Sequence, residues 1–158
     1  MKQLIAFTAA AVAASVPAFA FAQPNANAAP ISGEITLSSG FTGDPRIIAV
    51  TAGGANNAAR TANGCAGFIS DRPDVRLNFR NTGSSLPLII SVGAVGDTTL
   101  VINGPDGRWY CDDDGGNADN PSVRIARPAT GRYEIWIGTY ASGHSEAARL
   151  HISELTSQ

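Results

Sequence analysis

The stretch from Asp97 to Tyr140 constrains the fold most, because short segments of alternating polar and apolar residues follow one another in it at close intervals. Such alternation has a period of two, which places successive side chains on opposite faces of a β-strand. Clusters of glycine, proline, asparagine and aspartate separate the segments, as in antiparallel hairpins. The stretch therefore predicts four strands, at Thr98 to Asn103, Arg108 to Asp112, Ser122 to Ala126 and Gly131 to Tyr140.

The rest of the chain continues this pattern. Further strands are predicted at Gly33 to Leu37, Arg46 to Thr51, Gly64 to Ser70, Val75 to Arg80, Leu86 to Val92 and Arg149 to Leu155. Ala52 to Asn63 is small and polar, and we expect a long loop there. Because no amphipathic helix interrupts these short strands, the sequence predicts an all-β fold, an antiparallel β-sandwich of the jelly-roll kind.

The first residues, Met1 to Ala22, have the features of a secretory signal peptide: a lysine near the start, a largely apolar run and small residues at the end. An uncleaved membrane anchor is the alternative, since the apolar run is almost long enough to span a bilayer. Gln23 to Pro30 reads as a linker or a poorly ordered start, and residues 31–158 as a single domain. We expect a periplasmic or secreted protein that has no membrane contact after cleavage.

Net charge limits the partners of the mature chain. Cleavage removes the only lysine and leaves ten arginines against thirteen acidic residues, a formal charge of −3. This balance argues against nucleic acid and against anionic membrane surfaces. An extracellular or periplasmic protein or polysaccharide is the expected partner.

Cys65 and Cys111 are the only cysteines. An even pair without a Cys-x-x-Cys spacing in an oxidising compartment predicts one structural disulfide. A pair of metal-binding thiolates is the alternative, but it lacks neighbouring histidines.

An acidic loop follows Cys111 and suggests a cation site. Asp112, Asp113, Asp114 and Asp119 lie within it, among glycines that let the backbone turn around an ion. Oxygen ligands of this kind suit calcium. Asp97 and Asp106 join the site if their strands end at the same edge. A solvated turn, with its carboxylates bonded to nearby amides, is the alternative.

Two aromatic residues, Trp136 and Tyr140, share the outward face of the strand from Gly131 to Tyr140. Exposed aromatic rings stack on sugars or pack against a polypeptide, which predicts a ligand platform and makes a carbohydrate-binding module one candidate function. Cover by a loop or by the N-terminal segment is the alternative.

The sequence also resembles the bacterial pre-peptidase C-terminal domain, a β-sandwich accessory module found beside secreted peptidases. The resemblance lies in Asp97 to Leu100, Asn103 to Gly107, Asp112 to Gly116 and Pro128 to Tyr140. It implies a jelly-roll-like sandwich, life outside the cytoplasm and, in some members, calcium held by loop carboxylates. Thr99 stands where members often have a second acidic residue, so only the acidic positions that are present are carried over.

Relatives of this kind are often labelled serine peptidases, which makes a small hydrolase an alternative function. His144 and His151 are the only histidines, and no serine lies in a nucleophile-elbow motif. The residues therefore favour a secreted, non-catalytic binding or accessory module with no catalytic residues, and calcium is the one cofactor that the acidic loop suggests.

Overall fold

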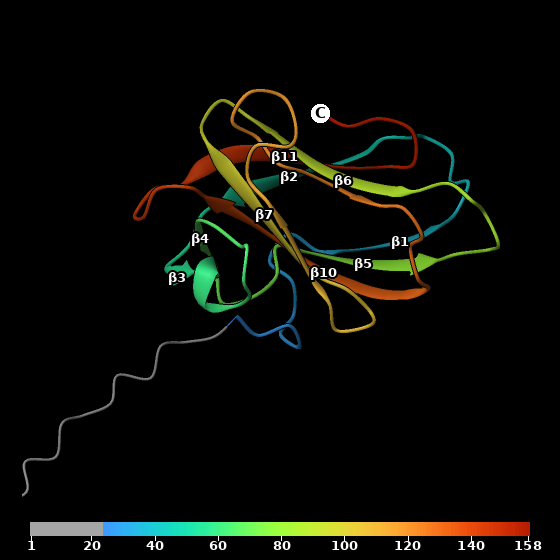
Figure 1. Cartoon of the computed structure of the whole chain (residues 1–158), viewed down its shortest axis with the longest axis horizontal. Coiled ribbons are helices and arrows are strands. Elements are labelled where there is room, and N and C mark those ends of the chain that lie inside the picture. The colour runs from blue at the N-terminus through green and yellow to red at the C-terminus, as the bar shows by residue number, and fades with distance from the viewer. Residues whose placement is uncertain (1–23) are drawn as a thin grey trace, which may run out of the picture.

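The structure, a computed structural model, describes residues 24–158 and shows two β-sheets packed face to face (Figure 1). The predicted signal peptide, Met1 to Ala22, lies outside the described residues. Among residues 24–158, no helix has the length and apolar character needed to cross a bilayer. The strands are β1 Glu34–Ser38, β2 Arg46–Ala52, β3 Asn56–Asn57, β4 Phe68–Ile69, β5 Val75–Arg80, β6 Leu88–Ala94, β7 Thr98–Asn103, β8 Trp109–Asp112, β9 Ser122–Ile125, β10 Gly131–Thr139 and β11 Glu146–Ser153, and one 3-10 helix spans Ala58–Arg60.

The connectivity confirms the jelly-roll-like sandwich. Strand pairs β2 with β11, β5 with β10, β6 with β9 and β7 with β8 are nested antiparallel partners along the chain. The four-stranded sheet has the order β2-β11-β6-β9, and the seven-stranded sheet contains β5, β10, β7 and β8. Such nesting is what a long antiparallel ribbon produces when it is rolled into two sheets.

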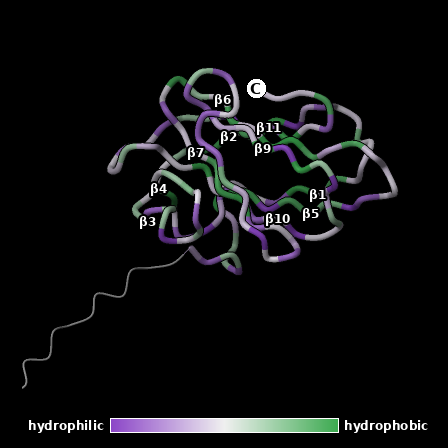
Figure 2. Tube along the Cα trace, in the orientation of Figure 1, coloured by the Kyte–Doolittle hydropathy of each residue, from purple (hydrophilic) through white to green (hydrophobic). Residues whose placement is uncertain are grey.

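The apolar core between the sheets follows from the period of two. On β10, Tyr133, Ile135 and Ile137 point into this core, as the alternation predicts. Leu100 and Ile102 of β7 do the same, and all five side chains are buried. Figure 2 shows apolar residues concentrated along the strands and polar residues in many of the loops.

One strand departs from the antiparallel pattern. β1 pairs with β5 in parallel, with Glu34 beside Arg76 and Ser38 beside Arg80. The chain then crosses to β2, at the edge of the other sheet. Alternation within a strand fixes its faces but contains no information on the direction of its neighbour, so the parallel pair could not be predicted.

β10 is the strand around which the seven-stranded sheet is built. Asp74 supplies a hydrogen-bond acceptor along one edge of this strand. β5 pairs with β10 from Gly131 to Ile135, and β4 pairs with it at Thr139. Ile137 lies between these two partners, and its N–H donates to Asp74 Oδ2 over 2.7 Å. A side-chain carboxyl group thus supplies the acceptor that a neighbouring strand would otherwise provide.

Asp74 should make the protein more stable at low pH than at high pH. The residue is 2% exposed, and burial raises its pKa to about 7, although the hydrogen bond from Ile137 opposes the shift. A carboxyl group with a raised pKa stays neutral in the folded state, while the unfolded chain ionises above the ordinary value of 3.8. Its contribution is therefore complete below pH 4 or so and is lost as the pH rises through about 7.

Asp74→Asn tests this, because an amide oxygen still accepts from Ile137 and never ionises. We expect the variant to be more stable than the parent at pH 8, by up to about 4 kcal/mol, and the difference to shrink towards pH 4. Urea unfolding at pH 4, 6 and 8 measures it. Parallel pH profiles for the two proteins would show that Asp74 is ionised in the folded state.

Candidate binding surface

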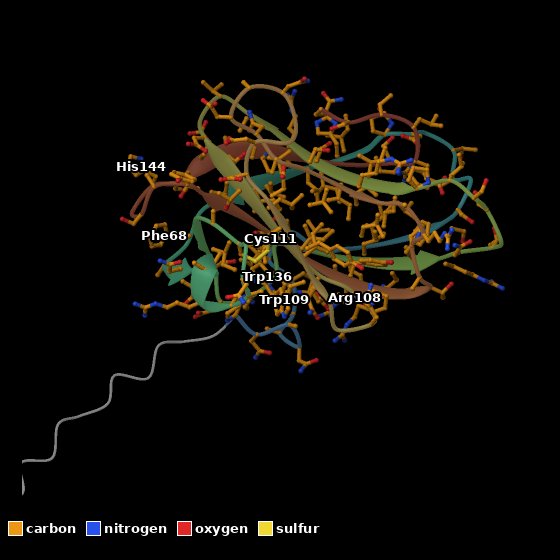
Figure 3. All side chains as sticks on the ribbon, viewed as in Figure 1. Phe68, Arg108, Trp109, Cys111, Trp136 and His144 are labelled. Carbon is orange, nitrogen blue, oxygen red and sulfur yellow. A yellow bond between two sulfur atoms is a disulfide. The ribbon has the colours of Figure 1, made fainter. Side chains whose placement is uncertain are left out.

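The outer face of the seven-stranded sheet, the face turned away from the other sheet, is covered by a second small apolar cluster. Trp136 of β10 lies at its centre and is 0% exposed. The ring of Trp109 lies 5.7 Å from it, centroid to centroid. Ala58, Cys65 and other small side chains close over the pair. Figure 3 shows both tryptophans beside Cys111, close to the disulfide.

A disulfide holds this cover in place. We call residues 55–67 the flap; it contains β3 and the 3-10 helix. Cys65 of the flap is bonded to Cys111 of β8, across a sequence separation of 46 residues and a Cα–Cα distance of 5.0 Å. The predicted disulfide is thus confirmed, and its position ties the flap to the sheet beneath it.

The flap region approaches the sheet so closely that glycine is required. A Cβ atom at Gly67 of the flap would lie 2.5 Å from Thr99 Oγ1 and 2.8 Å from the carbonyl oxygen of Thr139. The prediction of a plain loop from Ala52 to Asn63 was therefore wrong in part, since a short strand and a helical turn lie within it. Its small side chains, which suggested a loop, are what let it pack flat against Trp136.

The N-terminal segment, residues 24–32, covers the neighbouring part of the same face. Arg76 Nη2 donates to the carbonyl oxygens of Ala26 and Ala28, and Arg132 Nη2 donates to Asn27 Oδ1. Both arginines also bond to Glu134 Oε1, at 2.6 and 2.8 Å, and Glu134 is buried. Described residues of the predicted linker are therefore held against the domain, because an ion-pair network beneath them uses their backbone acceptors.

This cover corrects the predicted ligand platform. Trp136 faces outward from the sandwich as expected, but the flap buries it, so its ring is not available to a sugar or a peptide. Tyr140 is 53% exposed and stands beyond the end of β10. Trp136 is thus buried and Tyr140 exposed, although the alternation places both on the same face.

The six predicted calcium ligands do not form one site. Asp97 precedes β7, whereas Asp106 lies in the turn that joins β7 to β8, at the other end of this hairpin. Asp106 there pairs with Arg108 at 3.3 Å. Asp112 Oδ2 accepts the N–H groups of Gly115 and Ser122, so it shapes its own loop. Within residues 24–158, no group of three or more acidic, histidine or cysteine side chains is arranged to hold a metal ion.

Four carboxylates remain near one another at one end of the sandwich. Asp97 is exposed, but partial desolvation raises the pKa of its carboxyl group, and the negative charges of Asp114, Asp119 and Asp113 raise it further. Asn120, which the sequence analysis did not single out, organises this loop. It is buried, accepts from Thr98 Oγ1 at 2.7 Å and donates to the carbonyl oxygens of Ala94 and Asn117.

The outer face of the four-stranded sheet differs, since it carries a broad hollow of about 590 Å³. Its lining comes from β2, β11 and the end of β6, with Gln158 at one side. Small residues form much of it, namely Ala49, Gly93, Ala94, Ala147 and Ala148. The register places Arg149 between Ala49 and Gly93, at the middle of the face.

Two basic side chains line this hollow. Arg149 is exposed and has no ion-pair or hydrogen-bond partner among the described residues. His151 is 8% exposed, and its Nδ1 is buried without a hydrogen-bond partner. Burial lowers the pKa of His151, and the charge of Arg149 lowers it further, so the imidazole is neutral at pH 7. Sequence reasoning missed this surface, because the hollow exists only once three strands lie side by side.

The histidines do not form a catalytic arrangement among the described residues. His144 is an exposed loop residue at the edge of the molecule (Figure 3). His151 lies opposite Ser91 in the sheet, but the Ser91 hydroxyl is fully buried and accepts from the backbone N–H of Gln158. The charged group that acts on His151 is an arginine, whereas a catalytic triad needs a carboxylate there.

Comparison with known proteins does not assign this chain to a family. No protein-family model matches the chain, and no curated protein matches it. Among solved structures, the crystal structure of Aeromonas hydrophila PliG, a periplasmic lysozyme inhibitor of g-type lysozyme, is similar at 14% sequence identity and a TM-score of 0.43. The match covers 77% of this chain and 96% of that one.

Calcium binding stays a prediction for the four carboxylates that lie together. A divalent cation should relieve their mutual repulsion, so millimolar calcium should raise the melting temperature and a chelator should reverse the effect. Asp113→Asn/Asp114→Asn should raise the melting temperature without calcium and reduce the response to it. A melting temperature that is the same with calcium and with chelator would remove the hypothesis.

Proposed function

We propose that this chain is a secreted, non-catalytic binding module whose ligand occupies the outer face of the four-stranded sheet. One observation carries the proposal: other segments of the chain cover one outer face of the sandwich, whereas the other outer face carries a hollow. Residues 24–32 and the flap cover the outer face of the seven-stranded sheet, and Figure 1 shows both on the same side of the molecule. The four-stranded sheet instead presents the hollow, and the C-terminal segment covers only the part of that face near Ser91 and Ser122.

The composition of the hollow supports a binding role. A sheet face that needs only to meet water usually carries long polar side chains, whereas this hollow is lined by small side chains, exposed Val95 and an arginine that has no partner among the described residues. Concave surfaces with few, well-placed polar groups are the usual form of ligand sites.

A location outside the cytoplasm fits this role. The Cys65–Cys111 disulfide is of the kind that persists in oxidising compartments, and the predicted signal peptide leads there. The resemblance to the pre-peptidase C-terminal domain supports an accessory role beside a separately encoded enzyme, and the partner is then an extracellular or periplasmic protein.

Two alternative functions have less support. A serine hydrolase needs a histidine that contacts both a serine and a carboxylate, and neither histidine is placed so among the described residues. A carbohydrate-binding module would use exposed aromatic rings, but Trp136 is buried. Tyr140 alone supports that function.

A paired substitution tests the proposal. Ala147→Trp places a large ring in the hollow at an exposed position, and Thr36→Trp places the same ring in a smaller hollow of about 320 Å³ beside β1. The parent and both variants, each lacking residues 1–22, are immobilised and incubated with the extracytoplasmic fraction of the host. We expect a component that the parent and the Thr36 variant retain and the Ala147 variant loses.

Equal retention by the Ala147 variant would contradict the assignment of this face. A serine-directed covalent probe and a general peptide substrate complete the experiment. Labelling of any serine, or turnover by the pure protein, would contradict the non-catalytic role.

A further inference from the structure

The hollow on the four-stranded sheet has a charge opposite to that of the chain. None of the acidic side chains of residues 24–158 lines it, although they outnumber the basic ones there by three. Glu146, at the start of β11, lies at the rim of the hollow and is hydrogen-bonded there: its Oε1 accepts the N–H of Gly96 at 3.3 Å. Arg149 is therefore the exposed positive charge of this hollow, without an ion-pair partner among the described residues, and its planar guanidinium suits a carboxylate in forked hydrogen bonds.

The hollow also contains a second polar side chain, the imidazole of His151. The imidazole forms part of the hollow, with Nε2 3.7 Å from the position that a Cβ at Gly93 would take. Its Nδ1 has no hydrogen-bond partner although the residue is more than nine-tenths buried. A buried polar atom without a partner costs free energy, so the neutral imidazole is held here by its packing, with Nε2 on the side of Gly93.

Exposed apolar side chains lie on both sides of Arg149. Ile47, on β2, is 54% exposed and stands opposite His151; Val95, just after β6, is fully exposed and lines the hollow. Val95 directly follows Ala94, which pairs with Ala148. The side chains of Ile47 and Val95 therefore lie diagonally on opposite sides of Arg149. With strands about 4.8 Å apart and about 3.3 Å per residue, they are about 16 Å apart.

That separation fits a polypeptide. In an extended chain, residues i, i+2 and i+4 share one face and span about 13 Å, to which side chains add reach at each end. A central acidic residue with an apolar residue two positions away on either side would match Ile47, Arg149 and Val95 together. A sugar would need an exposed aromatic ring, and none of the aromatic side chains in residues 24–158 lines the hollow.

We propose that the hollow binds an extended segment of a partner protein with the pattern apolar-x-acidic-x-apolar, whose carboxylate is held by Arg149 over the imidazole of His151. This inference rests on the proposed function and adds the chemistry of the ligand to it. Ile47 and Val95 contact the apolar side chains, and the small residues between them leave room for the peptide backbone.

The probe is the peptide acetyl-Leu-Ser-Glu-Ser-Val-amide, titrated into the isotopically labelled protein at low salt while backbone amide signals are followed by NMR. We expect saturable shifts at Gly93, Val95, Ala147 and Arg149. Arg149→Gln should weaken binding at least about tenfold, as should glutamine in place of glutamate in the peptide. Serine in place of both apolar residues should also weaken it.

Arg124→Gln is the matched control, because Arg124 is an exposed arginine of the same sheet, beside Ile89, that does not line the hollow. It should leave the affinity within about twofold, since surface charges outside the site contribute little. The amide spectrum reports in the same samples that each variant is folded.

Equal binding of the glutamate and glutamine peptides, or an unchanged affinity in Arg149→Gln, would overturn the inference while leaving the face as a binding surface. If the peptide with serine in place of both apolar residues bound as tightly as the parent peptide, the apolar positions of the pattern would be wrong. Absence of saturable shifts in the parent would overturn the inference altogether, and the Ala147→Trp retention experiment would still decide the proposed function separately.

Discussion

The bond between Cys65 and Cys111 is the constraint on which the surface of this sandwich depends. It fixes the flap to β8, and the flap buries Trp136 beneath small side chains. On the loop-entropy model, a closed loop of this length stabilises a fold by about 4 kcal/mol. The same bond thereby keeps the part of β10 around Trp136 away from solvent.

The charged side chains on the two outer faces differ in their partners. The covered face is the outer face of the seven-stranded sheet, and the open face is the part of the four-stranded sheet that carries the hollow. On the covered face, Arg76 and Arg132 share Glu134 and hold the N-terminal segment, so their donors are engaged within the chain. On the open face, Arg149 has no such partner among the described residues. Charges that are satisfied internally position a segment, whereas an unsatisfied exposed charge is free to select a ligand.

Sequence reasoning predicted the sandwich well because strand alternation and turn residues are local signals. β5 and β7 begin and end where predicted, and the side chains of β10 alternate between the two faces of the sheet as its sequence does. It was wrong about Trp136, since alternation tells which face a residue occupies and not whether another segment covers that face. It grouped Asp106 with Asp97 for a similar reason: proximity in sequence does not show that a hairpin places them at opposite ends. The hollow around Arg149 joins three strands distant in sequence, so no local pattern indicated it.

The account depends most on one outer face being closed and the other open, and a soluble nitroxide measures this directly. In the NMR spectrum of the unliganded protein, the nitroxide should broaden the methyl signals of Ala49 and Ala147, which lie in the hollow. The indole N–H signal of Trp136 should stay sharp, because its nitrogen is buried. Broadening of the Trp136 signal to the same extent as the alanine methyl signals would show that the flap does not close its face, and would contradict the account.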